Sequence, residues 1–328
     1  MSAETKNFDL AGKCVFVAGH AGMVGSAILR RLAAEDCEVV VVPRRDCDLR
    51  QSENVDRFLA GARPDAIFLA AGTVGGIQAN STFPADFIAD NLAIALNVIR
   101  GAYHTGVRKL LYLGSSCTYP RLAPQPMTPD MLLGGPLEPT NQWYAVAKIA
   151  GIKLCEAYRI QHDADFISLM PASLYGPGDN YDLENSHVPA ALLRRFHEAK
   201  VSNTPRVIVW GTGTPRRELM AVDDLADACV FAMKSYSDVE FLNVGTGEDM
   251  TIGELARFIA EVVGYQGEIA FDPSKPDGMP RKLLDVSRIN ELGWRATISL
   301  GEGLHRMYAD FLKRFGAKFS DIKLARVT

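Results

Sequence analysis

Residues 13–26 read KCVFVAGHAGMVGS, a short apolar run followed by three glycines at intervals of three, Gly19, Gly22 and Gly25. The apolar run is typical of a buried strand, and the residues from Met23 have the spacing of a helix. Glycines allow a sharp turn between the two, and the start of a helix offers free N–H groups and the positive end of its dipole. This order of strand, glycine turn and helix predicts a dinucleotide-binding turn, with Met23 and Val24 as contacts beside the glycines.

The alternation of strand and helix continues through the first half of the chain. Apolar, β-branched runs predict strands at 13–18, 38–42, 65–70, 109–114 and 166–170. Segments with helical spacing lie between them, at 23–34, 53–60, 87–103 and 145–161. These repeated units predict an α/β fold with a doubly wound parallel sheet, helices on both faces, and a ligand crevice at the carboxyl ends of the strands.

The pattern changes after Tyr175, at the turn-rich stretch 176–180. The elements expected beyond it are shorter: a helix at 188–199, a strand at 206–210, a helix from Asp223, a strand at 241–244, a helix at 252–262 and a long loop at 271–280. We therefore expect a nucleotide-binding domain over 11–172, with a return around 216–250. A smaller C-terminal substrate lobe is expected from 173–215 and 251–328.

Composition bounds the class of protein. The chain has 328 residues, 48% of them apolar and 23% charged, with a net charge of −4. These values exclude a disordered chain and argue against binding to nucleic acid or an anionic membrane through bulk charge. No apolar run is long enough to span a membrane, and the start of the chain lacks the features of a signal peptide. The six cysteines are scattered without a Cys-x-x-Cys pair, so we expect reduced thiols, no metal site and a soluble cytoplasmic protein.

The tip of the second predicted strand indicates which cofactor binds. An NAD site usually has an acidic residue there, whereas arginine accommodates a 2′-phosphate. This chain reads Val-Pro-Arg-Arg at that point, ending in Arg44 and Arg45. The sequence therefore predicts NADPH or NADP, with the two arginines on the 2′-phosphate, Asp48 at the adenine and Leu49 as a further contact.

Three residues of the types used in carbonyl reduction follow. Ser115 comes at the carboxyl end of the predicted strand 109–114, where its hydroxyl is able to polarise a carbonyl oxygen. Tyr144 and Lys148 form the only Tyr-x-x-x-Lys pair in the chain and share one helix face. We expect Lys148 to lower the pKa of the Tyr144 phenol and to hold the nicotinamide ribose. The glycine turn, the strand-end serine and this pair, in that order, resemble the extended short-chain dehydrogenase/reductase family, which has the Rossmann fold.

Cys117 and His187 form a second pair of candidates, which ordinary reduction does not need. Cys117 lies two residues after Ser115, so on an extended segment it points to the same side. His187 precedes a predicted helix, a place where histidine is more often a cap than a catalyst. A thiol and an imidazole on opposite sides of a keto sugar are able to move protons at the carbons that flank the carbonyl.

Longer strings make the chain similar to the GDP-L-fucose synthase family, the epimerase/reductases that act on GDP-4-keto-6-deoxy-D-mannose. The similarity covers nearly the whole chain. Its longest strings are GHAGMVGS (19–26), GSSCTYP (114–120), EPTNQWYAVAKIAGIKLCE (138–156), NSHVPAALLRRFHEA (185–199), WGTGTPRRE (210–218) and SKPDGMPRKLLDV (274–286).

The resemblance implies epimerisation at C3 and C5 and NADPH-dependent reduction at C4, giving GDP-L-fucose. It implies Ser115, Tyr144 and Lys148 as the reductase triad, and Cys117 and His187 as the epimerisation pair with Cys117 the base. The implied substrate contacts are Arg195, Trp210, Arg217 and Asp277, and the further implied cofactor contacts are Lys148, Pro171, Ser173, Leu174 and His187. It also implies a homodimer formed through the helices 87–103 and 145–161.

Alternatives remain open at this point. Thr73, Ser173 and Ala221 differ from the family pattern, which leaves the same chemistry, or 4-reduction alone, on another GDP-4-keto-deoxy sugar. A dehydratase or 4-epimerase with tightly held NAD is disfavoured by the arginine pair and by Cys117. The last alternative is a non-enzymatic NADP-sensing protein, which has no need of the Ser-Tyr-Lys triad.

Overall fold

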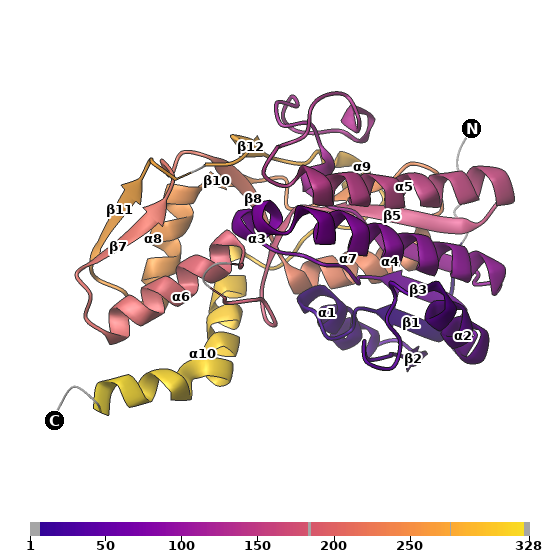
Figure 1. The fold of residues 1–328 in the computed structure, drawn as a ribbon, viewed down its shortest axis with the longest axis horizontal. Helices are drawn as coiled ribbons and strands as arrows, with labels where there is room; N and C mark the ends of the chain where they lie inside the picture. Colours follow the sequence, from indigo (N-terminus) through magenta and orange to yellow (C-terminus); the bar gives the residue numbers. More distant parts are fainter. Residues whose placement is uncertain (1–6, 183–184, 276, 325–328) are drawn as a thin grey trace.

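The computed structural model describes residues 7–182, 185–275 and 277–324 (Figure 1). Its larger part is built on a six-stranded parallel sheet with the order β2-β1-β3-β4-β5-β9. The strands are β1 (Cys14–Ala18), β2 (Glu38–Val40), β3 (Ala66–Leu69), β4 (Lys109–Leu113), β5 (Asp165–Pro171) and β9 (Leu242–Val244). The strand order reverses between β1 and β3, and the carboxyl ends of these strands form the crevice in which open α/β sheets bind ligands.

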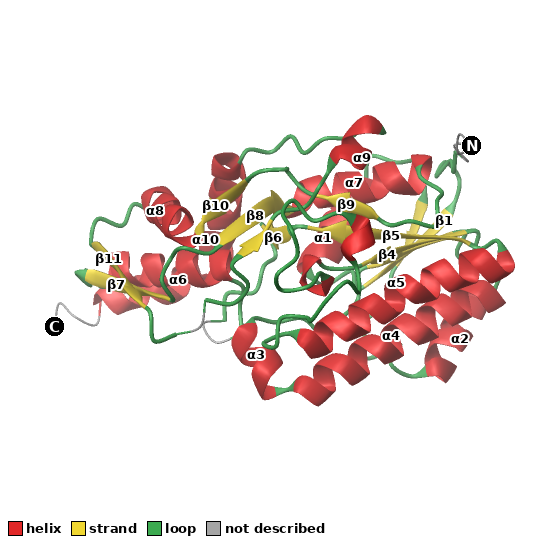
Figure 2. Ribbon diagram, turned by 90° about the horizontal axis from the view of Figure 1, so that it is seen from above, coloured by secondary structure: helices red, strands yellow, loops and turns green. Residues whose placement is uncertain are grey.

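Helices cover both faces of this sheet, which confirms the predicted doubly wound α/β fold (Figure 2). One face carries α1 (Met23–Leu32) and α7 (Val222–Ser235), and the other carries α2 (Ser52–Ala62), α4 (Pro84–His104) and α5 (Gln142–His162). A short helix, α3 (Ile77–Thr82), precedes α4. Strands buried on both sides by these helices read as unbroken apolar runs, and β3 and β4 are buried at every position.

The smaller part has a hydrophobic core of its own, around Phe196, Leu255 and Phe311. Its main sheet has the order β10-β8-β12, with β6 also paired to β8, and a separate pair is formed by β7 and β11. These strands are β6 (Ser173–Tyr175), β7 (Arg206–Trp210), β8 (Arg216–Ala221), β10 (Asp249–Thr251), β11 (Glu268–Asp272) and β12 (Arg281–Lys282). The helices of this part are α6 (Val188–Val201), α8 (Ile252–Val263) and α10 (Leu300–Leu324), whereas α9 (Ser287–Glu291) packs against β9 of the large sheet.

The predicted elements of the first half are present, with ends that differ by a few residues. The second strand ends at Val40 rather than residue 42, shortly before Pro43, which lacks the N–H that a sheet needs. The loop expected at 271–280 is shorter, because Phe271 and Asp272 pair with β7. The strands β6, β8, β10 and β12 were not predicted, since most are too short to show an alternating pattern.

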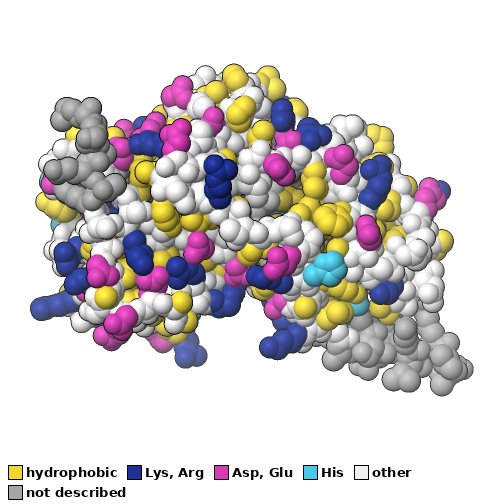
Figure 3. Space-filling model, turned by 180° about the vertical axis from the view of Figure 1, so that it is seen from behind, with side chains coloured by type: hydrophobic (Ala, Val, Ile, Leu, Met, Phe, Trp, Pro, Cys, Tyr) yellow, Lys and Arg dark blue, Asp and Glu magenta, His cyan; other side chains and the backbone are white. Residues whose placement is uncertain are grey.

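The chain returns to the large sheet through α7 and β9, whereas β8 belongs to the smaller sheet. Residues 325–328, the end of the expected C-terminal lobe, lie outside the described residues. In the described part of the chain, no helix is long and apolar enough to cross a membrane. On the face shown in Figure 3, basic side chains lie among acidic ones, so this face carries no large patch of one charge.

Candidate active site

The glycine turn between β1 and α1 leaves no room for a side chain at two of its three glycines, Gly19 and Gly25. A Cβ on Gly25 would lie 2.1 Å from the carbonyl oxygen of Gly19. Gly19 itself has a φ of +86°, and a Cβ there would lie 2.7 Å from the backbone of Ala71 at the end of β3. Gly22 is the N-cap of α1 and places no side chain over the N–H groups of the first turn. This open helix start, at the point where the strand order reverses, fits the pyrophosphate of a dinucleotide.

The arginine pair after β2 projects from the rim of this crevice. The side chains of Arg44 and Arg45 are 67% and 84% exposed, and their nearest carboxylates lie at 3.9 and 3.6 Å. Asp48, by contrast, is held by Arg50, whose Nη2 donates to Oδ2 at 2.6 Å. These hydrogen bonds from Arg50 lower the pKa of Asp48. The two arginines are therefore available to a phosphate, whereas the carboxylate of Asp48 already has a partner.

Ser115, Tyr144 and Lys148 meet at the carboxyl end of β4. Lys148 on α5 is 5% exposed, and its Nζ donates to the carbonyl oxygen of Leu113 at 2.9 Å. The same nitrogen lies 5.8 Å from the centre of the Tyr144 ring. The hydroxyl of Ser115 interacts with the Tyr144 phenol, and Phe87 packs its ring against that phenol edge-on at 6.4 Å. The serine and the phenol are thus placed to act on one carbonyl oxygen.

The expectation that Lys148 lowers the pKa of Tyr144 is wrong for this structure. Burial raises the pKa of Tyr144 above its ordinary value, and the interaction with Ser115 offsets only part of that rise. Burial also lowers the pKa of Lys148, to about 8. Removing these groups from water disfavours the charged form of each. The raised pKa favours the protonated phenol of Tyr144, the form that is able to donate a proton.

Cys117 reaches the site for a different reason from the one expected. Ser116–Thr118 form a turn of 3₁₀ helix capped by Ser115, so the segment is not extended. The backbone N–H of Cys117 donates to the Ser115 hydroxyl at 3.4 Å, and its thiol faces Lys282, whose Nζ lies 3.1 Å from Sγ. Burial alone raises the pKa of the Cys117 thiol. Lys282, Ser115 and Arg217 outweigh burial and bring the pKa below its ordinary value.

His187 lies across from this group, at the N-cap of α6. Its backbone segment packs against the loop before α3, where Gly76 donates to the carbonyl oxygen of Asn185 at 2.9 Å. A Cβ on Gly76 would lie 2.6 Å from the Ser186 carbonyl oxygen, so a glycine is required there. Residue His187 is exposed. Desolvation of its imidazole by the protein around it, followed by the charge of Lys282, lowers the pKa of the imidazole. Lys282 therefore acts on both members of the expected epimerisation pair.

The expected substrate residues cluster in the smaller part. The Arg195 guanidinium lies 5.2 Å from the centre of the Trp210 ring, and the Lys275 ammonium lies 5.5 Å from it. The guanidinium of Arg217 donates to the carbonyl oxygen of Arg216 at 2.8 Å. These cations and the exposed indole offer charge for a diphosphate and a face for a base.

Asp277 differs from the other expected substrate contacts because its carboxylate is already engaged. Its Oδ1 accepts from the Thr212 N–H at 2.7 Å and its Oδ2 from the Thr212 hydroxyl at 2.9 Å. A Cβ on Gly211 would lie 2.1 Å from Oδ1. Asp277 thus shapes the turn that follows Trp210.

Three of the remaining predicted residues, Pro171, Ser173 and Leu174, lie near the junction of the two sheets, whereas Leu49 follows β2 at the edge of the large sheet. Pro171 ends β5, while Ser173 and Leu174 begin β6 and pair with Leu219 and Met220 of β8. Leu49, beside Asp48, accepts at its carbonyl oxygen from Asn97. Two of the three positions that depart from the family pattern are Thr73 and Ala221. The Thr73 hydroxyl donates a hydrogen bond to Asp90 at 2.9 Å, and Ala221 is buried at the end of β8.

Lys282 is the functional candidate that the sequence did not predict. It lies 165 positions after Cys117 and reaches it only because β12 pairs with β8 at the register Lys282 to Arg217. A lysine in a loop-like stretch carries no local signal of such a contact. The string 274–286 contains it, but nothing in that string distinguishes it from a surface residue.

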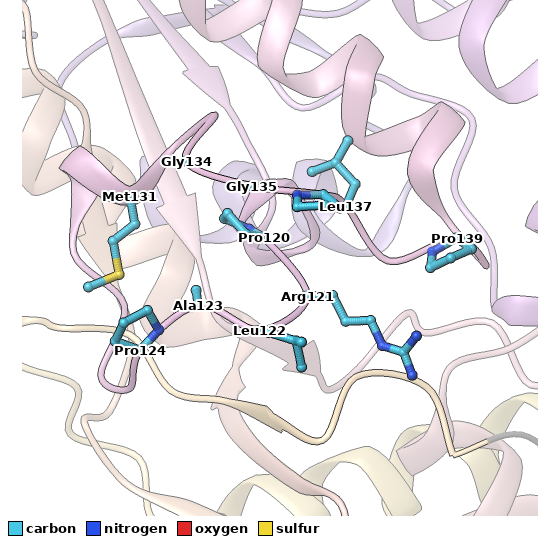
Figure 4. Close-up of a pocket in the computed structure, with 11 residues that line it drawn as sticks. Pro120, Arg121, Leu122, Ala123, Pro124, Met131, Gly134, Gly135, Leu137 and Pro139 are labelled. Carbon is cyan, nitrogen blue, oxygen red and sulfur yellow. The ribbon is translucent and has the colours of Figure 1, made fainter.

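An apolar pocket of about 510 Å³ lies in the segment between Pro120 and Pro139 (Figure 4). Arg121 is the only charged residue that lines it among the described residues, and none of the candidate residues lines it. The pocket lacks the polar groups that a nucleotide sugar needs, so we take the group around Tyr144 and Cys117 as the candidate site of chemistry.

Comparison with known proteins places the chain in a family. Residues 15–245 match the sequence model of the NAD dependent epimerase/dehydratase family. The chain belongs to this family. It is 59% identical over 302 residues to the probable GDP-L-fucose synthase 1 of Oryza sativa subsp. japonica, covering 92% of each chain.

Solved structures of other nucleotide-sugar enzymes have a similar fold. A GDP-L-fucose synthetase from Naegleria fowleri bound to NADP has a TM-score of 0.87 at 25% identity, covering 95% of this chain and 99% of that one. A GDP-6-OMe-4-keto-L-xylo-heptose reductase from Campylobacter jejuni has a TM-score of 0.89 at 32% identity, covering 94% and 99%.

Proposed function

We propose that the protein is an NADP-dependent GDP-L-fucose synthase, which epimerises GDP-4-keto-6-deoxy-D-mannose at C3 and C5 and reduces it at C4. The observation that carries this proposal is the meeting of two sets of groups in one cleft. Ser115, Tyr144 and Lys148 suit reduction of a carbonyl, and the Cys117 thiol beside Lys282 suits removal of a proton. The 59% identity to the rice protein supports the same substrate.

The glycine turn and the arginine pair suit NADP. The open start of α1 would hold the pyrophosphate, Arg44 and Arg45 the 2′-phosphate, and Lys148 the nicotinamide ribose. Pro171, Ser173 and Leu174, at the carboxyl end of β5, are further contacts in this proposal. When bound, NADPH supplies a hydride to C4 of the sugar. The NADP-bound synthetase of Naegleria fowleri supports the choice of cofactor.

The residues of the cleft divide the proton transfers between them. The Cys117 thiolate removes a proton at C3 or C5, which the neighbouring ketone makes acidic. Ser115 and Tyr144 stabilise the resulting enolate by hydrogen bonds to its oxygen. His187, carried by α6 from the other part of the molecule, returns a proton on the opposite face. In the final reduction, Tyr144 gives its proton to the C4 oxygen.

The two parts of the molecule have separate tasks in this proposal. The part around the large sheet, over 11–172 with the return through α7 and β9, binds the cofactor. The smaller part, over 173–215 and from 251 onward, binds the GDP sugar through Arg195, Trp210 and Arg217. Remote binding of the nucleotide would position the sugar ring for both steps.

A homodimer formed through α4 and α5 is part of the proposal. The two helices lie side by side on the outside of the molecule (Figure 2). They expose large apolar side chains, Leu96, Trp143, Val146 and Ile160, at 47%, 44%, 41% and 72%. Sedimentation should give twice the monomer mass, and Leu96→Glu with Ile160→Glu should halve it; a monomer in the unaltered protein would contradict this.

The free cysteines of the structure suit a reducing, cytoplasmic setting.

One reaction in D₂O tests the function. The protein is mixed with NADPH and GDP-4-keto-6-deoxy-D-mannose, and the product is analysed by NMR. We expect NADPH oxidation and an L-galacto product with deuterium at C3 and C5. Oxidation without deuterium would leave a plain 4-reductase and would overturn the roles of Cys117 and His187.

A second candidate is the same chemistry, or reduction alone, on another GDP-4-keto-deoxy sugar. Thr73, Ser173 and Ala221 favour it, as does the similar fold of the Campylobacter jejuni heptose reductase. Absence of NADPH oxidation with the deoxymannose substrate, but oxidation with a related sugar, would establish this alternative.

A further inference from the structure

Lys282 forms an unusual contact with Cys117. Its Nζ lies 3.1 Å from Sγ, and among the described residues the thiol is its only hydrogen-bond partner. An ammonium group has donors and no acceptor, whereas a neutral thiol is a weak acceptor. A thiolate satisfies the ammonium far better, because hydrogen bonds between ionised partners are stronger than neutral ones. The contact therefore favours an ionised Cys117.

Hydrogen bonds of the residues on both sides of Lys282 hold the backbone of β12 in place. On one side Arg281 donates to the buried carboxylate of Asp249 at 2.5 Å. On the other, Glu218, which is 1% exposed, accepts from the Leu284 N–H at 2.8 Å. The Leu283 N–H donates to the Gln125 side chain at 2.8 Å. Because these contacts flank Lys282, its side chain starts from a defined backbone position.

The groups that face the Cys117 thiol are Ser115 on its own segment, Tyr144 on α5, Arg217 on β8 and Lys282 on β12. Two of these are cations and two are uncharged. No carboxylate among the described residues is found to act on the thiol. The balance of charge at Sγ is therefore positive, which favours the anion.

We propose that Lys282 is a positioning residue of the epimerisation site, whose ammonium holds Cys117 as the thiolate that removes the sugar proton. The inference rests on the function proposed above. The C–H bond breaks, an S–H bond forms, and the electron pair moves to the C4 oxygen as an enolate. His187, whose lowered pKa lets it release a proton readily, then relays a proton from solvent to the opposite face of the same carbon, which restores the ketone. Lys282 keeps its proton throughout, and water resets the thiol and the imidazole.

Alkylation of Cys117 tests the assignment without any sugar. The full-length protein with NADP bound is treated with iodoacetamide over a range of pH, and modification of the Cys117 peptide is followed by mass spectrometry. The variants are Lys282→Met, Lys282→Gln and Lys282→Arg, with Lys313→Met, at an exposed position on α10, as the control for loss of a lysine. Thermal unfolding of each variant checks that it is folded.

We expect the Lys282→Met and Lys282→Gln proteins to alkylate at least about tenfold more slowly at neutral pH, because each unit of thiol pKa changes the thiolate fraction tenfold. Lys282→Arg should restore most of the rate, and Lys313→Met should match the unaltered protein. A folded Lys282→Gln protein with an unchanged pH profile would overturn the assignment.

Exchange in D₂O separates this inference from the proposed function. We expect the same variants that slow alkylation to slow deuterium entry at C3 and C5 by a similar factor. If alkylation slows but the unaltered protein exchanges no deuterium at either carbon, the epimerisation role is overturned while the Lys282–Cys117 ion pair stands.

Discussion

The two sides of the active-site cleft are prepared for chemistry by different forces. On the side of the large sheet, burial sets the proton affinities: the pKa of Tyr144 is raised and that of Lys148 is lowered to about 8. At Cys117, where the smaller lobe meets this sheet, fixed cations of the lobe set them, because Lys282 and Arg217, together with Ser115, overcome the effect of burial on the thiol pKa. In the proposed function, burial would thus keep Tyr144 protonated for the reduction, and the nearby cations would favour the thiolate of Cys117 for the epimerisation.

The largest expected effect comes from removing the Tyr144 hydroxyl, the proposed proton donor in the reduction. Tyr144→Phe should slow NADPH oxidation by about 10²–10⁴-fold, the usual contribution of a positioned acid. Tyr158→Phe, on the same helix and outside the cleft, is the control and should react at the normal rate. Stopped-flow absorbance of NADPH measures both. A normal rate in Tyr144→Phe would remove the phenol from the reduction.

The glycine turn offers a matched pair of substitutions. Gly25→Ala places a Cβ 2.1 Å from a backbone oxygen, so it should lower the free energy of unfolding by about 2–4 kcal/mol. Gly22→Ala places its Cβ 3.5 Å from the Gly19 carbonyl oxygen, an ordinary contact, and should leave folding nearly unchanged. Urea unfolding compares the two proteins. Equal losses of stability would mean that the turn is not packed as described.

The arginine pair should affect the choice of cofactor more than the rate. Replacing Arg44 and Arg45 by serine should raise the KM for NADPH about 10–100-fold, since two charge-assisted contacts to the 2′-phosphate are lost. The KM for NADH, which lacks that phosphate, should barely move and serves as the control in the same protein. An equal rise for both cofactors would contradict a 2′-phosphate site.

The smallest expected effect is on stability and concerns Lys148. Its folded-state pKa of about 8 lies below that of the unfolded chain, so burial of the ammonium destabilises the fold below that pH. Lys148→Met should therefore raise the free energy of unfolding at neutral pH by about 1–2 kcal/mol while it impairs reduction. The difference in the free energy of unfolding between the variant and the unaltered protein should narrow as the pH rises above about 8, because Lys148 then loses its charge in the folded protein. A difference that widens with pH would show that burial does not set the pKa of Lys148.

The same contrast explains what the sequence was able to predict. The large sheet and the placement of Ser115 at the carboxyl end of β4 follow from local patterns, strand by strand. The pKa of Tyr144 was predicted in the wrong direction, since a motif shows which charge is near but not how much water is excluded. Cys117 was predicted from an extended segment that is in fact a helical turn.

The contacts that residues of the smaller lobe make with Cys117 were much harder to predict. Lys282 and Arg217 reach Cys117 through strands of two and six residues whose pairing is decided by the whole fold. The substrate contact expected of Asp277 stays a prediction, and the hydrogen bonds of its carboxylate to Thr212 were not expected from the sequence. Contacts between residues so far apart in the chain leave no periodic signal in the sequence.

Exchange without reduction tests most directly whether the two sides work separately. The protein is incubated in D₂O with GDP-4-keto-6-deoxy-D-mannose and NADP⁺, which cannot reduce the ketone, and the recovered sugar is examined by NMR. We expect deuterium at C3 and C5 with the unaltered protein, detectable exchange with Tyr144→Phe, and none with Cys117→Ser. Exchange by Cys117→Ser at the rate of the unaltered protein would contradict the role of Cys117 as the base.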